Sequence, residues 1–203
     1  MSAPARWTTT RFSEERKAIL SDESLQGLAL CQALAGLADR WLAKLLGDAD
    51  GVALVAVGGY GRSELAPGID LDVLLVHRNR RDVEELARRV WYPIWEEGIA
   101  LDHGVKTIDE ALAVAGKDLK AALGLLDART IAGDAELGET LASRAREAWQ
   151  RKPKKWMEAL AEATALRHHR FGDVAFLLEP ELKEGKGGLR DITGLRAVEL
   201  ALP

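Results

Sequence analysis

Cysteine is nearly absent from this sequence, since Cys31 is the only one in 203 residues. A single cysteine cannot form an intrachain disulfide, so a disulfide-held scaffold is excluded and a reducing compartment is expected. Histidine is scarce too, with four residues. The sequence has no cysteine–histidine cluster of the kind that binds zinc, which disfavours a zinc site or a histidine-rich metallohydrolase.

An excess of positive charge is also missing. The sequence has 28 Lys and Arg against 32 Asp and Glu, a formal net charge of −4, so no general nucleic-acid surface is indicated. No apolar run approaches the length of a membrane-spanning helix, and the first ten residues lack the apolar core of a signal peptide. We therefore expect a cytoplasmic protein that binds neither nucleic acid nor membrane.

The sequence does contain a strand–turn–strand pattern. The apolar run Val52–Val57 ends in Gly58-Gly59, and a Pro67-Gly68 turn signal precedes a second apolar run, Val73–Val76. A short β-branched and aliphatic run closed by glycine is typical of a buried strand. Glycines at that point let the backbone turn tightly and bring its N–H groups close to an anion, although Gly-Gly alone is equally compatible with a plain turn.

Three acidic residues accompany this pattern. Asp70 and Asp72 are separated by one residue, which on a strand places both carboxylates on one face, roughly 6–7 Å apart at the backbone. Such a pair beside a phosphate-binding loop suits Mg²⁺; the alternative, two solvent-facing residues, leaves like charges together without a cation. Asp102, in the alternating stretch 99–106, is a third candidate as ligand or base, and His103 could orient it. The alternative for Asp102 is an edge-strand surface residue.

Basic groups occur at two places. Arg62 follows the glycine turn and could bind phosphate oxygens bidentately; the alternative is a surface ion pair with Glu64. A second dense segment, 178–191, combines glycines with basic side chains before a helix. Its candidate nucleotide-binding residues are Lys183, Lys186, Gly187, Gly188 and Arg190. The alternative for this segment is a solvated loop.

Helical periodicity fills most of the remaining chain. Helices are predicted over 12–20, 23–46, 81–97, 119–129, 135–149, 153–169 and 192–202, and a further helix begins at the Thr107–Glu110 capping box. Pro93 should kink the helix over 81–97 or mark its last turns, and Asp118 should cap the helix over 119–129. The predicted class is α+β, a small mixed sheet packed by helices with a C-terminal helical extension. Three parts are expected: an N-terminal helical segment (1–48), a core (49–134) and the extension with its Gly/Lys loop (135–203).

Together these motifs resemble the nucleotidyltransferase superfamily that includes DNA polymerase β, whose pattern is Gly-Gly or Gly-Ser, a spacer, Asp-x-Asp and a third acid on a later strand. More narrowly, the chain is similar to the bacterial PII signal-protein uridylyltransferase/uridylyl-removing enzymes. The resemblance covers about Val52 to the C-terminus and implies a polymerase β-like fold. The matching motifs are 58–67, 70–72, 103–107, 125–129, 133–134 and 178–191.

The resemblance implies Mg²⁺-dependent transfer of UMP from UTP to a tyrosine of the PII protein, or of AMP from ATP, as some members do. By this resemblance, the triphosphate would be bound by Gly58, Gly59, Gly61 and Arg62. Mg²⁺, of which two ions are expected, would be held by Asp70 and Asp72, and Asp102 would take the place of the third acid. The sequence departs from relatives at several positions, and Gly104 and Lys106 replace a usual serine and arginine. Many relatives carry the third acid where this chain has Ala100, and Ile69 replaces a common serine.

The family's full chain continues into a phosphohydrolase domain that removes the nucleotide and two domains that sense glutamine. Nothing here corresponds to them, so we expect the transferase domain alone, without removing activity or a glutamine response. Two other functions stay open: a stand-alone nucleotidyltransferase acting on another protein or a small molecule, and a non-catalytic nucleotide-binding module that regulates a partner. The Gly/Lys segment disfavours the first, and the three acids disfavour the second.

Overall fold

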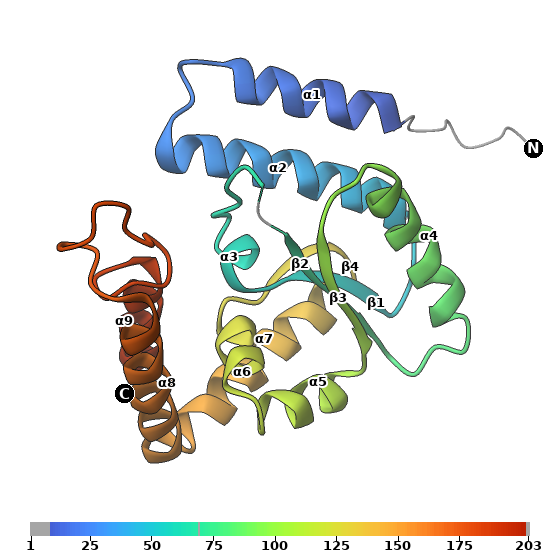
Figure 1. Ribbon diagram of the computed structural model, residues 1–203. Helices are drawn as coiled ribbons and strands as arrows, with labels where there is room; N and C mark the ends of the chain where they lie inside the picture. The colour runs from blue at the N-terminus through green and yellow to red at the C-terminus, as the bar shows by residue number, and fades with distance from the viewer. Residues whose placement is uncertain (1–8, 69, 202–203) are drawn as a thin grey trace, which may run out of the picture. The chain divides into compact units, whose positions relative to one another are not determined.

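A computed structural model describes residues 9–68 and 70–201 (Figure 1). Within these residues no helix is both long and apolar enough to cross a membrane. The elements, in chain order, are α1 (Thr9–Ser21), α2 (Gly27–Leu46), β1 (Val52–Ala56), α3 (Gly58–Gly61), β2 (Leu71–His77), α4 (Val83–Glu96), β3 (Leu101–Lys106), α5 (Ile108–Ala115), α6 (Leu119–Leu126), β4 (Arg129–Gly133), α7 (Ala135–Gln150), α8 (Pro153–Phe171) and α9 (Leu189–Ala201).

The four strands form one mixed sheet in the order β3-β2-β1-β4. Strand β1 pairs antiparallel with both β2 and β4, whereas β2 and β3 are parallel. A parallel pair needs a crossover connection, and α4 provides it between β2 and β3. The predicted α+β class, with a small mixed sheet packed by helices, is confirmed, and the arrangement is consistent with a polymerase β-like nucleotidyltransferase fold.

Strand β1 lies at the centre of the sheet and is buried on both faces, as its unbroken apolar run predicts. Val52, Leu54 and Ala56 belong to the main core, together with buried residues of α2, β2 and α4. Helices α1 and α2 run side by side along this face (Figure 1). On the other face α7 approaches closely: a Cβ at Gly138 would lie 2.1 Å from Thr130 Oγ1 of β4.

The chain divides into two compact units. The first contains the residues up to Ala111 and Asp127–Ala142, and therefore the whole sheet; the second contains Leu112–Leu126 and the residues from Ser143 onward. In the second unit the rings of Trp149 and Trp156 stack with centroids 5.0 Å apart, and Trp149 Nε1 donates to the carbonyl of Ala197 at 2.9 Å. The three-part division predicted from the sequence stays a prediction.

Several local predictions are confirmed. Thr107 Oγ1 accepts a hydrogen bond from the Glu110 N–H at 3.3 Å, and Glu110 Oε2 accepts one from the Thr107 N–H at 2.7 Å, which is a capping box. Asp118 Oδ1 caps α6 by accepting from the Ala121 N–H at 2.6 Å. Pro153 is the first residue of α8.

The predicted helix over 119–129 is wrong in its last part. Helix α6 ends at Leu126, and Arg129–Gly133 forms strand β4. The local helical pattern does not reveal that β1 has an edge to pair here, with Val55 opposite Thr130 and Ala56 opposite Arg129. Pairing with a buried strand overrides the local helical preference of a short segment.

Candidate active site

The sheet brings two of the three candidate acids together. Asp72 of β2 and Asp102 of β3 are direct register partners in the parallel pair. Neighbouring strands lie about 4.8 Å apart and paired residues share a face, so both side chains leave the same side of the sheet. The Leu71 N–H donates to the carbonyl of Ala100 at 2.9 Å, which fixes this register at the start of both strands. Asp70 precedes β2 and is exposed.

The glycine turn lies against Asp72. Residues Gly58–Gly61 form the short helix α3 directly after β1, and the Val57 N–H donates to the Asp72 carbonyl at 3.1 Å. Gly58 has a φ of +57°, a conformation that favours glycine, and a Cβ built there would be 3.5 Å from Asp72 Oδ2. The turn, Asp72 and Asp102 therefore form one contiguous site where β1 ends and β2 and β3 begin.

The donor chemistry of this site fits Mg²⁺, which prefers oxygen ligands and completes its shell with water and substrate phosphates. Asp72 and Asp102 offer carboxylates from adjacent strands. Among residues 9–68 and 70–201, no group of three or more His, Cys, Asp or Glu side chains is gathered as metal ligands. The predicted Mg²⁺ site at Asp70, Asp72 and Asp102 stays a prediction, and Ile69, the departure beside it, lies outside the described residues.

Arg62 forms two ion pairs. Its Nε contacts Glu64 Oε2 at 2.8 Å and its Nη1 contacts Asp127 Oδ2, so the ion pair with Glu64 that was the alternative to a phosphate contact is present. Partial burial by itself lowers the pKa of the Arg62 guanidinium, but the charge of Asp127 and the hydrogen bonds to both carboxylates outweigh it and raise that pKa. Nη2 lies beside Gly59, 3.9 Å from a Cβ built there. The predicted phosphate contact stays a prediction.

The sequence interpretation missed a polar cluster behind the glycine turn. Tyr60 is buried, and its hydroxyl donates to Asp39 Oδ1 of α2 at 2.7 Å. Arg129 of β4 donates to Asp39 Oδ2 at 2.7 Å and to the Gly61 carbonyl at 3.1 Å. Burial raises the pKa of the Tyr60 phenol far above its usual value, and the Asp39 charge adds to this. The available signals were the motifs 58–67 and 125–129, which contain Tyr60 and Arg129, but neither residue was given a role.

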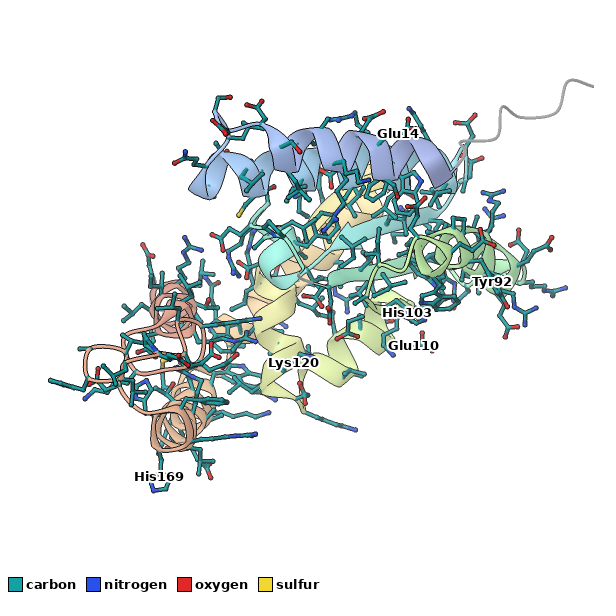
Figure 2. All side chains as sticks on the ribbon, turned by 45° about the horizontal axis from the view of Figure 1, so that its top comes forward. Glu14, Tyr92, His103, Glu110, Lys120 and His169 are labelled. Atoms are coloured by element: carbon teal, nitrogen blue, oxygen red, sulfur yellow. The ribbon has the colours of Figure 1, made fainter. Side chains whose placement is uncertain are left out.

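His103 does not lie on the same face as Asp102. Consecutive residues of a strand point to opposite faces, and the His103 ring packs against Trp91 and Trp95 of α4 with centroid distances of 5.3 and 5.4 Å. Tyr92 extends this aromatic cluster, with its ring 5.5 Å from that of Trp95 (Figure 2). His103 therefore helps to hold β3 against α4, and the prediction that it orients Asp102 is wrong.

The Gly/Lys segment in the second unit is an ordered loop. The Lys186 N–H donates to the Gly172 carbonyl at 2.8 Å, and the Val174 N–H donates back to the Lys186 carbonyl at 3.1 Å. Lys186 and Arg190 lie near Asp173 and Glu184, at 3.7 and 3.2 Å. The contacts predicted for Lys183, Lys186, Gly187, Gly188 and Arg190 with a triphosphate stay a prediction.

One carboxylate fixes this loop. Asp191, in the first turn of α9, accepts hydrogen bonds from Arg167, from His168 Nε2 at 2.8 Å and from the Gly187 N–H at 2.7 Å. Burial alone would raise the pKa of Asp191, but these three bonds outweigh it and lower that pKa to about 2. A simple solvated loop would lack such a set of contacts, so the geometry favours a preformed loop.

Comparisons with known proteins agree with the motifs. A family model described as GlnD PII-uridylyltransferase matches residues 155–199. The chain is 48% identical over 193 residues to the bifunctional uridylyltransferase/uridylyl-removing enzyme of Streptomyces coelicolor, covering 92% of this chain and 23% of the relative. The enzyme of the same name from Mycobacterium tuberculosis H37Rv is 41% identical over 210 residues, covering 99% and 26%.

A match over a shorter part of the chain extends the comparison beyond these two organisms. The bifunctional uridylyltransferase/uridylyl-removing enzyme of Thiobacillus denitrificans is 42% identical over 163 residues, which cover 78% of this chain and 19% of the relative. The chain thus spans about a quarter of the length of the Streptomyces and Mycobacterium relatives. The chain belongs to the GlnD uridylyltransferase family and corresponds to one region of the longer members of that family.

Proposed function

We propose that this chain is a nucleotidyltransferase that moves UMP from UTP, or AMP from ATP, onto a tyrosine of a PII signal protein and releases pyrophosphate. The observation that carries the proposal is the in-register pair of Asp72 and Asp102 beside the Gly58 turn. Family membership supports the same chemistry, since the relatives are named for uridylyl transfer.

In the proposed reaction the tyrosine oxygen attacks the α-phosphorus in line, the new P–O bond forms, and the bond to the leaving pyrophosphate breaks. The tyrosine proton passes to a base, for which exposed Asp102 is suited by its place beside Asp72. Mg²⁺ held by Asp70, Asp72 and Asp102 would, when bound, neutralise charge on the phosphate oxygens.

The remaining residues bind the triphosphate in this proposal. The backbone N–H groups of Gly58, Gly59 and Gly61 belong to a tight turn, the geometry that brings such groups close to an anion. Arg62 adds a guanidinium next to Gly59. In the second unit, the preformed loop supplies Lys183, Lys186 and Arg190 and the amides of Gly187 and Gly188, which would neutralise charge on the leaving pyrophosphate.

The proposal is tested by incubating the chain with Mg²⁺, a PII protein and labelled UTP or ATP, followed by intact-mass measurement. A mass increase of PII equal to one UMP or one AMP supports the proposal and identifies the base. Label on a small molecule or another protein, but never on PII, would support a different transferase. Nucleotide binding without any transfer would support a binding module.

The acid pair is tested by a double variant, Asp70→Asn with Asp72→Asn. Because both carboxylates are needed for the metal and neither is part of the core, we expect transfer to be lost while the circular dichroism spectrum and thermal midpoint are kept. Asp48→Asn with Asp50→Asn is the matched control, an exposed Asp-x-Asp pair at the opposite end of β1. Near-normal turnover in the first variant would refute the assigned role.

A further inference from the structure

The segment 127–129, which comprises the connection after α6 and the first residue of β4, has no part in the chemistry above, yet it contacts the glycine turn. Helix α3 has only four residues, Gly58–Gly61. Forming an isolated helical turn is unfavourable, because several residues are fixed for very few hydrogen bonds. Groups outside the turn must therefore stabilise its position.

The first such contact is steric. A Cβ built on Gly61 would lie 2.0 Å from the carbonyl oxygen of Asp127 and 3.1 Å from that of Ala56. Real Cβ atoms do not approach a backbone oxygen this closely, so glycine is required here by close approach rather than by backbone conformation. The turn is thus held directly against the start of the connection to β4.

The second contact is made by the guanidinium of Arg129. Its Nε donates to the Gly61 carbonyl at 3.1 Å and its Nη2 to the Tyr60 carbonyl at 3.3 Å. These carbonyls lie at the end of the turn, and the Tyr60 carbonyl also accepts from the Ser63 N–H at 2.9 Å. The same guanidinium holds Asp39 bidentately, through Nη1 at 2.7 Å and Nη2 at 3.2 Å.

The third contact links the turn to α2. The Tyr60 ring is buried, its hydroxyl donates to the same Asp39 carboxylate, and the Arg129 guanidinium carbon lies 5.6 Å from the ring centroid. Asp39, Tyr60 and Arg129 therefore connect α2, α3 and β4 in one cluster of charge-assisted hydrogen bonds. On its other side, the turn faces Asp72 through Gly58.

The position of the turn sets the gap between its backbone and the carboxylate of Asp72, which is the gap that nucleotide phosphates would occupy. We propose that Arg129, with Asp39 as its carboxylate partner, is a positioning residue that holds the glycine turn at the distance from Asp72 needed for transfer. This inference rests on the proposed function and extends it to residues that touch no substrate atom.

The test compares Arg129→Ala with the unaltered chain. Displacing a binding group by about 1 Å costs on the order of 100-fold in rate, so we expect kcat/KM for the nucleotide to fall by about that factor while KM for the PII protein stays the same. Affinity for labelled UTP or ATP, measured by equilibrium dialysis, should fall as well. Guanidinium ion added at millimolar concentration should restore part of the lost activity, because it can occupy the vacated site.

Two further variants separate positioning from stability. Asp39→Asn keeps an oxygen for the Tyr60 hydroxyl but removes the charge that orients Arg129, and we expect the same selective loss toward the nucleotide from it. Arg78→Ala is the control, since Arg78 also pairs with two carboxylates, Asp134 and Glu136, at the far end of β1. We expect this control to transfer normally.

Amide hydrogen exchange over residues 57–65 gives a readout apart from activity, and exchange there should accelerate in Arg129→Ala and Asp39→Asn. Unchanged exchange together with unchanged kcat/KM for the nucleotide in these variants overturns the inference and leaves the proposed function intact. An equal loss toward nucleotide and PII, without guanidinium rescue, also overturns it in favour of general destabilisation. Absence of both nucleotide binding and transfer in the unaltered chain overturns the proposed function and this inference together.

Discussion

Replacing Asp191 with asparagine should release the ordered loop of the second unit. The carboxylate accepts hydrogen bonds from Arg167, His168 and the Gly187 N–H, and its side chain is 25% exposed. An asparagine at this position would keep a single acceptor oxygen and no charge, so the Arg167 guanidinium, only 14% exposed, would lose its counter-ion.

The size of the effect follows from the pKa of Asp191, which is lowered from 3.8 to about 2 by these contacts. A change of this size corresponds to roughly 2 kcal/mol of stabilisation at neutral pH. Because the folded-state pKa lies below the unfolded one, the stabilisation is complete above about pH 4 and is lost as the pH falls through about 2. The difference between the unaltered chain and Asp191→Asn should therefore close over that interval.

The assay is amide hydrogen exchange at Gly187, whose N–H donates to Asp191 Oδ2 at 2.7 Å. A loss of about 2 kcal/mol in local opening free energy predicts roughly thirty-fold faster exchange in Asp191→Asn at neutral pH. Glu158→Gln is the matched control in the same unit. Glu158 pairs with Lys154 at 4.0 Å, and both side chains are largely exposed, so its loss should change exchange very little.

Two results would refute this reasoning. Equal exchange at Gly187 in the unaltered chain and in Asp191→Asn would mean that the carboxylate does not hold the loop. A difference that persists undiminished at pH 2 would mean that its charge is not the cause.

Two further predictions concern the glycine turn. Gly61→Ala should lower the free energy of unfolding by about 3 kcal/mol in thermal unfolding, because its Cβ would lie 2.0 Å from the Asp127 carbonyl oxygen. Tyr60→Phe should cost about 1–2 kcal/mol through loss of the hydrogen bond to Asp39. Because burial raises the folded-state pKa of Tyr60, the fold is stabilised below about pH 10 and destabilised as the pH rises above it; phenolate absorbance from Tyr60 should therefore appear only with alkaline unfolding.

Each of these has a control in the same unit. Gly36 of α2 has only the flexible end of Arg40 near its ideal Cβ, at 3.5 Å, so Gly36→Ala should stabilise the helix by about 0.5–1 kcal/mol. A similar midpoint for both alanine variants would contradict the steric argument. Tyr92 is 55% exposed and serves as the comparison for Tyr60; ionisation of both phenols with the fold intact would contradict the second prediction.

Local patterns were enough to predict much of the fold. The apolar run 52–57, the glycine turn and the acid pair follow one another within a short stretch, and each is specified by neighbouring residues. The Thr107–Glu110 capping box and the Asp118 cap are likewise local and are confirmed. These features can be predicted from the sequence because the residues that interact are at most a few positions apart in the chain.

The missed features depend on partners that are distant in sequence. Arg129 and Asp39 are 90 residues apart, and no spacing rule connects them. Strand β4 forms because β1 has a free edge with which it can pair. The sequence before β4 continues the helical pattern of α6, so this pairing could not be read from local residues. The sequence predicted that Asp102 lies near Asp72, but not that the two residues are direct register partners. The register of a parallel pair depends on how the two strands pack in the folded protein.

The parallel register of β2 and β3 also limits how the third acid can change its place during evolution. Positions 100 and 102 lie on the same side of an extended chain, so an acid can move by two residues and still point toward Asp72. A one-residue deletion inside β3 ahead of Asp102 would instead turn Asp102 toward the tryptophans of α4 and place His103 opposite Asp72, whereas a change of length in the loop before β3 would leave the register unchanged. Changes of length inside β3 should therefore be tolerated only in pairs of residues, a parity rule that sequences of relatives can be searched for.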